Sequence, residues 1–167
     1  MGDELTVSMS LSISYKLTGS GWAECALEID GQGIVTTASY LSHALESLLQ
    51  SVVELLNGQA DSAASFDEEP GEYRWRFKRI DEQTISIRIL WFDKLWGREP
   101  DEKGQFVFEA TCRLRTFAGA VLSASQQLFA EHGFEGYKLK WVEHDFPLEL
   151  QDELKRLLAE GQQANAE

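Results

Sequence analysis

The N-terminal part of the chain alternates between apolar and polar side chains. In residues 5–17 every second position is apolar, and the positions between them hold Ser, Thr or Lys. A period of two is typical of a β-strand with one buried and one solvated face. Two further alternating segments, 22–30 and 34–39, follow glycine-containing turns at 19–21 and 30–33. The pattern therefore predicts three strands joined by hairpins.

A helical period follows the third strand. Apolar residues from Leu41 to Leu56 recur at spacings of three and four, and Gly58 stands where a C-terminal cap would. Residues 59–71 are small, polar and acidic. We interpret them as a connection without regular structure.

The second half of the chain repeats this order. Alternation predicts three more strands, after which spacings of three and four predict a helix that ends at Gly133. Residues 137–142 are interpreted as a short strand, and Pro147 suits the first turn of a last helix that ends near Glu160. The three strands of this half are 73–78, 85–91 and 105–112, with a loop at 93–104.

Hairpins and half-solvated strands favour an antiparallel sheet, because parallel strands need a long crossover between them. We expect an α+β fold of two layers, in which about six mainly antiparallel strands carry two to three helices on one face. Three strands and a helix occur twice in order, which raises the hypothesis of a βββα internal duplication. Residues 1–160 are expected to form a single domain, and 161–167 a disordered tail.

Composition and charge narrow the classes of function. Of the 167 residues 43% are hydrophobic, so the chain can bury a core and is not of the disordered class. It carries 28 acidic and 15 basic residues, a net charge of −13, which opposes binding to nucleic acid. Two cysteines are too few for a disulfide framework, and no apolar run approaches the roughly 18 residues of a membrane-spanning helix. We expect a cytoplasmic protein that binds neither nucleic acid nor membrane.

Familiar catalytic signatures are missing from the sequence. It has neither a Gly-x-Ser-x-Gly motif nor a glycine-rich phosphate loop. Cys25 and Cys112 fall in predicted strands, where a small apolar core residue is the simplest interpretation. We expect no cofactor and no metal, and we favour a non-enzymatic role. The densest set of metal-ligating residue types fits no established zinc spacing; it consists of His132, Glu143, His144 and Asp145.

The charges are unevenly distributed along the chain. Residues 59–72 carry five acids and no base, whereas residues 73–92 carry five bases and two acids. Cross-strand ion pairs on a solvated sheet face explain the bases, and the alternative is an open polar face that docks a ligand. Alternation places four of the bases on the face opposite the aromatic residues of their hairpin: Arg74, Arg76, Lys78 and Arg88.

A loop with a tryptophan follows this hairpin. Trp and Arg are the residues that most often anchor protein interfaces, and Trp96 and Arg98 both lie in this loop. The alternative is that Leu95 and Trp96 fold back over a sheet edge and complete the core. Both interpretations stand at this point.

The first functional hypothesis is an acidic, non-enzymatic protein-binding domain, such as an inhibitor or immunity protein for a basic partner. The alternative is a small-molecule-binding protein or enzyme, with a pocket between sheet and helices or near His132 and His144. A homodimer formed through an edge strand such as 5–17 is compatible with both. The residues predicted to contact the partner are Asp67, Glu68, Glu69, Glu72, Trp96, Arg98, Asp101 and Glu102.

Overall fold

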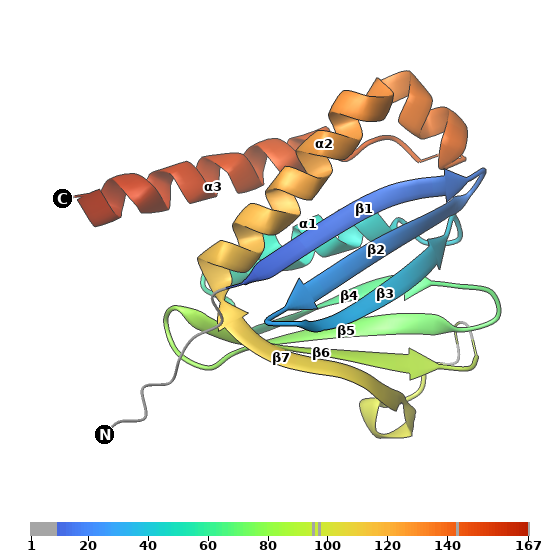
Figure 1. Ribbon diagram of the computed structural model, residues 1–167, viewed down its shortest axis with the longest axis horizontal. Coiled ribbons are helices and arrows are strands. Elements are labelled where there is room, and N and C mark those ends of the chain that lie inside the picture. Colours follow the sequence, from blue (N-terminus) through green and yellow to red (C-terminus); the bar gives the residue numbers. More distant parts are fainter. Residues whose placement is uncertain (1–9, 95, 97, 143, 167) are drawn as a thin grey trace.

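The computed structural model describes residues 10–94, 96, 98–142 and 144–166. The predicted strand 5–17 lies partly outside these residues, and its described part belongs to β1. The elements follow one another as in Figure 1. They are β1 (Leu11–Gly19), β2 (Trp22–Ile29), β3 (Gln32–Ser39), α1 (Ala44–Leu56), β4 (Asp61–Asp67), β5 (Glu72–Arg79), β6 (Thr84–Phe92), the 3-10 helix η1 (Asp101–Lys103), β7 (Gln105–Arg113), α2 (Leu114–Lys140) and α3 (Leu148–Ala166).

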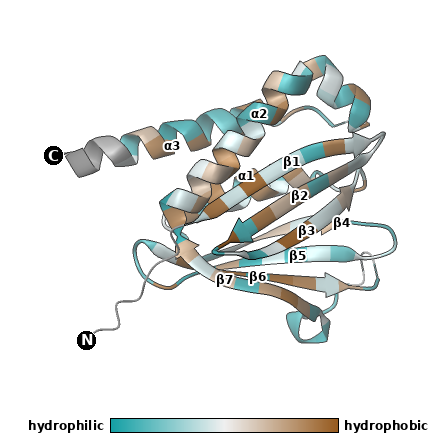
Figure 2. Ribbon diagram, in the orientation of Figure 1, coloured by the Kyte–Doolittle hydropathy of each residue, from teal (hydrophilic) through white to brown (hydrophobic). Residues whose placement is uncertain are grey.

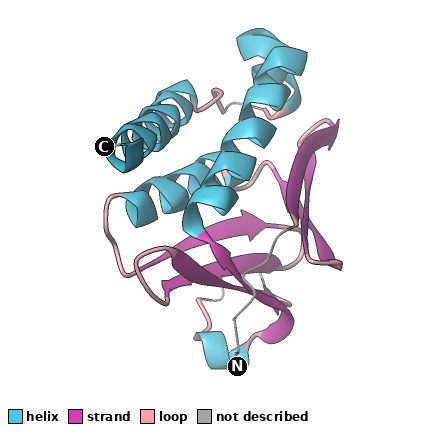
Figure 3. Ribbon diagram, turned by 60° about the vertical axis from the view of Figure 1, so that its left-hand side comes forward, coloured by secondary structure: helices cyan, strands magenta, loops and turns pink. Residues whose placement is uncertain are grey.

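The strands form two antiparallel sheets. One holds β1, β2 and β3 in that order, and the other holds β4, β5, β6 and β7. The α+β class and the antiparallel pairing expected from the sequence are confirmed. The described residues form seven strands in two sheets, where the sequence predicted about six strands in one. Figure 3 shows the α-helices α1, α2 and α3 on one side of the sheets, and β3 contacts β4 where the sheets meet.

A left-handed turn joins the last two strands of the first sheet. Asp30 and Gly31 have φ angles of 48° and 86°, as in the type I′ turns that suit the twist of a hairpin. The apolar face of β2 points into the core, as its alternation predicts. Its buried residues are Ala23, Cys25, Leu27 and Ile29.

Strand β4 corrects the interpretation of residues 59–71 as an irregular connection. Ala64 and Phe66 of this strand are buried in the core, and short polar or small residues occupy the alternate positions. Phe66 packs against Trp75 of β5, with ring centroids 5.2 Å apart. The segment is therefore a strand with one buried face, although its sequence is weakly hydrophobic.

The outer edge of β4 is closed by α1 and the residues just before it. Ser47 Oγ accepts a hydrogen bond from the backbone N–H of Ser65 at 2.9 Å, and Ser42 Oγ accepts one from Asp67 at 3.0 Å. These hydroxyls replace the neighbouring strand that an edge strand lacks. The apolar side of α1 is buried at the centre of the core through Leu45, Leu48, Leu49, Val52 and Leu55.

The end of α2 corrects a second prediction. Gly133, with φ of 67° and ψ of −175°, interrupts the helix, so the predicted stop is a kink after which the chain becomes helical again. Residues 137–142 were predicted as a strand, yet Tyr137 and Trp141 are fully buried while Leu139 is 79% exposed. Tyr137 and Trp141 stand four residues apart, so a helix presents both on one face.

Helix α3 packs against α1 and α2. It is buried on one side through Gln151 and Leu154, and Figure 2 shows hydrophilic residues along much of its length. Its backbone extends through Ala166, beyond the end near Glu160 that the sequence indicates. The disordered tail 161–167 and the single domain 1–160 stay predictions. Among the described helices, none combines the length and apolar character needed to cross a membrane.

Candidate functional site

Two of the predicted contact residues face each other at the end of the β4–β5 hairpin. Asp67 closes β4 and lies directly opposite Glu72, which begins β5. Each residue is only 8% exposed. Burial raises the pKa of Asp67, against the opposing hydrogen bond from Trp96. Burial also raises the pKa of Glu72; Arg74 opposes this effect and the charge of Asp67 adds to it.

The turn between these two strands is closely packed. The backbone N–H of Glu68 donates to the carbonyl of Gly71 at 2.7 Å, and the Glu68 carboxylate accepts a hydrogen bond from the Thr37 hydroxyl of β3. A side chain at Gly71 would collide with the carbonyl oxygen of Phe92, so only glycine fits there. Glu69, at the tip of the turn, is exposed.

Trp96 lies in the loop between β6 and β7 and is 65% exposed. Its Nε1 donates a 3.1 Å hydrogen bond to Oδ2 of Asp67, which fixes the indole beside the buried carboxylate. Trp96 and Arg98 have φ angles of 61° and 52°, which are uncommon for residues with a side chain. The exposure of Trp96 overturns the interpretation in which it completes the core. Leu95, the other residue of that interpretation, lies outside the described residues.

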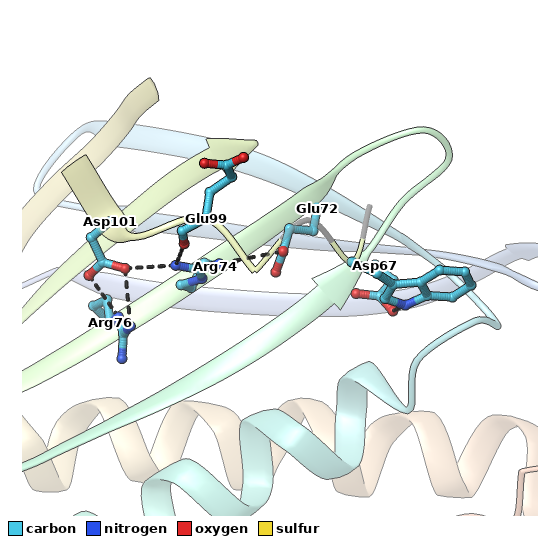
Figure 4. A network of polar contacts seen from close by, with 7 residues as sticks. Asp67, Glu72, Arg74, Arg76, Glu99 and Asp101 are labelled. Carbon is cyan, nitrogen blue, oxygen red and sulfur yellow. Dashed lines mark hydrogen bonds and ion pairs between the residues drawn. The ribbon is translucent and has the colours of Figure 1, made fainter. Parts of the chain in front are cut away.

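A clamp of charged residues fixes the second part of this loop to the sheet (Figure 4). The Asp101 carboxylate accepts hydrogen bonds from Arg76, at 2.8 and 3.0 Å, and from Arg74 at 2.8 Å. Arg74 also donates to the carbonyl of Glu99 at 2.9 Å and lies 3.5 Å from the Glu72 carboxylate. Burial acts to raise the pKa of Asp101, but the hydrogen bonds from Arg76 and Arg74 outweigh it and lower that pKa.

Half of the predicted contact residues line one pocket of about 400 Å³, which we call the Trp96 pocket. These are Asp67, Glu72, Trp96 and Arg98. Among the other four, Glu68 is bonded to Thr37, Asp101 forms the clamp, and Glu69 and Glu102 are exposed. Three further lining residues were not among the predicted contact residues: Ser42, Ser65 and Arg74. Recognition of β4 as a strand would have placed Ser65 on the face of Asp67.

The basic residues of the outer sheet face are mostly paired. Nε of Arg88 lies 3.9 Å from Glu109, the residue directly opposite on β7, and the guanidinium lies over the ring of Phe106. Arg74 and Arg76 are paired with Asp101. These contacts agree with the interpretation of the basic set as ion pairs on a solvated face.

A second pocket, of about 740 Å³, lies where the start of α1 meets the connection between α2 and α3. His43 and His144 stack in it with ring centroids 4.8 Å apart. Nδ1 of His43 contacts the Glu46 carboxylate, and its Nε2 lies 3.2 Å from the hydroxyl of buried Tyr137. Burial lowers the pKa of His43; Glu46 opposes this effect and His144 adds to it.

The remaining residues considered for chemistry do not gather around a common point. His132 lines a separate pocket against β1, and Glu143 lies outside the described residues. Asp145 lines the second pocket and pairs with a lysine of α2. In the part of the chain that the structure describes, no three His, Cys, Asp or Glu residues are arranged to hold a metal ion. Cys25 and Cys112 are free and buried, and burial raises the pKa of each thiol to about 12.

Comparison with known proteins gives no family. No protein-family model and no curated protein matches the sequence. Among solved structures, one chain of the CdiA-CT/CdiI toxin and immunity complex from Enterobacter cloacae is similar, with 12% identity and a TM-score of 0.45. The similarity covers 70% of this chain and 99% of that chain. At these values it concerns part of the fold and carries no information about function.

Proposed function

We propose that this chain is a non-enzymatic, acidic protein-binding domain of the inhibitor or immunity type, whose partner is a basic protein. The observation that carries the proposal is the position of Trp96. A large aromatic side chain that is 65% exposed gains the free energy of burying its apolar surface only when a partner covers it. Its hydrogen bond to Asp67 holds it in one place, and a pre-oriented aromatic residue is typical of interface anchors.

The charge of the chain supports a basic partner. A net charge of −13 accelerates the approach of a basic protein by electrostatic steering and slows the approach of an acidic one. Glu69 and Glu102, two of the predicted contact residues, are exposed, so they can contribute to steering without losing an internal partner. We define the proposed binding surface as Trp96, Arg98, Glu69 and Glu102 together with the Trp96 pocket.

Affinity capture with matched variants tests this proposal. The immobilised chain is exposed to a lysate of the source organism at low and at high salt, and retained proteins are identified by mass spectrometry. We expect a basic protein that is retained at low salt, released at high salt, and retained about tenfold less by Trp96→Ala. Trp22→Ala, which removes an exposed indole from the other sheet, is the control. Equal retention by both variants would exclude the proposed surface.

Charge reversal gives a second, kinetic test once that partner is known. Glu69→Lys and Glu102→Lys should slow association and weaken its dependence on salt, while dissociation changes less. Glu28→Lys changes the charge by the same amount on an exposed position of β2 and is the matched control. An association rate that falls equally in all three variants would assign the effect to net charge alone.

The second pocket supports one alternative function, the binding of a small molecule by an enzyme or a binding protein. Its volume of about 740 Å³ and the stacked imidazoles of His43 and His144 are the observations in its favour. Thermal-shift screening of metabolites against the chain and against His144→Ala tests it. A stabilising compound whose effect disappears in the variant would favour this function. If no compound stabilises the chain in this way and a partner is captured through Trp96, the small-molecule function is excluded.

The homodimer hypothesis concerns the edge strands. β1 is an outer strand, as predicted, and α2 packs against it. β7 is the outer strand of the other sheet and leaves Phe106 and Val107 exposed, so pairing of two β7 strands is the better-supported route. Sedimentation equilibrium should show a dimer that Val107→Lys converts to a monomer; a monomeric unmodified chain would contradict it.

For the cellular compartment we propose the cytoplasm, which suits two free cysteines.

A further inference from the structure

The carboxylate of Asp67 has no cationic partner in the part of the chain that the structure describes. The residue is more than nine-tenths buried, yet among the described residues neither Lys nor Arg forms an ion pair with it. Its Oδ2 accepts the indole N–H of Trp96, and no side chain or backbone group that the structure describes donates to its Oδ1. A buried carboxylate is normally paired, because removal from water without a partner is costly.

Asp67 and Glu72 both line the Trp96 pocket. The two acidic residues are register partners across β4 and β5, so their side chains leave the same face of the sheet. Arg74 does not neutralise both, because its guanidinium also binds Asp101 and the Glu99 carbonyl and lies over the Phe92 ring. The pocket therefore presents buried negative charge with unused acceptor capacity.

We propose that the Trp96 pocket receives the guanidinium of one arginine side chain of the partner, with the Asp67 and Glu72 carboxylates as acceptors and the Trp96 indole as the stacking surface. This inference rests on the proposed protein-binding function. Arginine fits better than lysine, because a planar guanidinium can donate to two carboxylates and stack on an aromatic ring at once. The indole at the pocket also provides a cation–π contact that an uncharged side chain would not gain.

The effect of substituting Arg98 distinguishes a cationic occupant of the Trp96 pocket from an acidic one. It lines the same pocket, it is exposed, and no ion pair of Arg98 occurs among the described residues. If the occupant is cationic, Arg98 is a like charge beside it, and Arg98→Ala should leave its affinity unchanged or increase it. If the occupant were a carboxylate, Arg98 would be a cationic donor without an ion pair beside it, and the same variant would lose binding.

A titration with small probes tests the proposal on the whole chain. N-acetyl-arginine amide is added to the ¹⁵N-labelled protein, and the indole N–H resonance of Trp96, assigned with Trp96→Phe, is followed. We expect a saturable shift, weakened about tenfold or more by Asp67→Asn, since a hydrogen bond to a charged group is lost. N-acetyl-citrulline amide, which has the same shape and no charge, should produce no saturable shift. N-acetyl-lysine amide should bind more weakly than the arginine probe.

Several outcomes would overturn the assignment. They are the absence of a saturable shift, equal binding of the citrulline or lysine probe, tighter binding of N-acetyl-aspartate amide, and loss of arginine binding in Arg98→Ala. Asp67→Asn keeps an oxygen that can accept from Trp96, and an amide spectrum confirms that it folds. Glu72→Gln gives an independent second variant, expected to weaken the arginine probe severalfold.

The capture experiment separates failure of this inference from failure of the proposed function. A partner that is retained through Trp96 and binds Asp67→Asn with unchanged affinity would support the proposed binding surface and contradict the arginine pocket. If the arginine probe binds as expected and the partner is retained equally by Trp96→Ala and Trp22→Ala, the arginine pocket is supported and the proposed protein-binding surface is contradicted.

Discussion

The indole nitrogen of Trp96 donates a 3.1 Å hydrogen bond to Oδ2 of Asp67, 29 residues earlier in the chain. The donor belongs to an exposed side chain in a loop, and the acceptor is a buried carboxylate at the end of an edge strand. Loop and strand are therefore coupled. Displacement of Trp96 would leave Asp67 buried with a negative charge and without this donor.

Burial of the Asp67 carboxylate outweighs this hydrogen bond and predicts that the charge of Asp67 destabilises the free protein. Burial raises its pKa above 3.8, so the folded state holds this proton more tightly than the unfolded chain. The resulting loss of stability is present above the folded pKa and disappears as the pH falls toward 3.8. Asp67→Asn should therefore have a higher free energy of unfolding than the parent chain near pH 8 and about the same near pH 4.

Urea unfolding at both pH values measures this difference. Glu69→Gln, which removes an exposed acid from the neighbouring turn, is the matched control and should change little at either pH. An Asp67→Asn variant that is less stable than the parent near pH 8 would mean that the ionised carboxylate is stabilised by groups other than Trp96.

The extent to which the sequence predicted the fold depended on hydrophobic contrast. β5 alternates aromatic residues with Arg and Lys, and β6 places isoleucines at every second position from 85 to 89; the positions of both strands were predicted closely. β4 was missed because Ala64 and Phe66 are its main buried residues and small or polar residues flank them. The end of α2 was taken for a strand because Tyr137, Leu139 and Trp141 alternate, although the first and last also fit a helical period.

The candidate site was predictable only in its residue types. Acidic residues and a loop tryptophan indicated a contact region, and the structure places Asp67, Glu72 and Trp96 around one pocket. Which acids are buried depends on the register of β4 with β5, and the missed strand concealed that register. Asp101 was predicted as a contact residue of the loop that holds Trp96, whereas its pairing with Arg74 and Arg76 depends on the return of the loop to the sheet.

The Asp101 clamp predicts a specific loss on substitution. Asp101→Asn removes the charge that binds two arginines and should lower the free energy of unfolding by about 1 kcal/mol near neutral pH. The pKa of Asp101 lies below 3.8 in the folded protein, so this stabilisation is present above that value and is lost as the pH falls through the folded pKa. Glu102→Gln, at the exposed neighbouring position, should have no measurable effect in the same urea titration. Equal losses in both variants would contradict a role for the clamp.

The serines that close the edge of β4 predict a local opening. Ser47→Ala leaves the backbone N–H of Ser65 without its acceptor, and should lower stability by about 1–3 kcal/mol if no water replaces the hydroxyl. Hydrogen exchange of the Ser65 amide should accelerate more than exchange in the central strands. Ser12→Ala, at an exposed position of β1, is the control. An unchanged exchange rate at Ser65 would show that α1 covers this edge without the hydroxyl.

The stacked histidines predict a loss of stability in mild acid. Burial lowers the pKa of His43 below 6.5, so the unfolded chain binds this proton more readily than the folded protein. Stability is therefore lost as the pH falls from 6.5 through the folded pKa, and protonation of Nε2 would also end its role as acceptor for the Tyr137 hydroxyl.

His43→Gln removes this titration and keeps polar atoms near Glu46 and Tyr137. Between about pH 7.5 and pH 5 the parent chain should lose more free energy of unfolding than the variant does. Ser12→Ala, which removes no titratable group from an exposed position of β1, should retain the slope of the parent chain. If His43→Gln and the parent lose stability equally over this interval, the pH dependence arises elsewhere, and the contact between His43 and Tyr137 serves packing at the start of α1 and has no part in sensing protons.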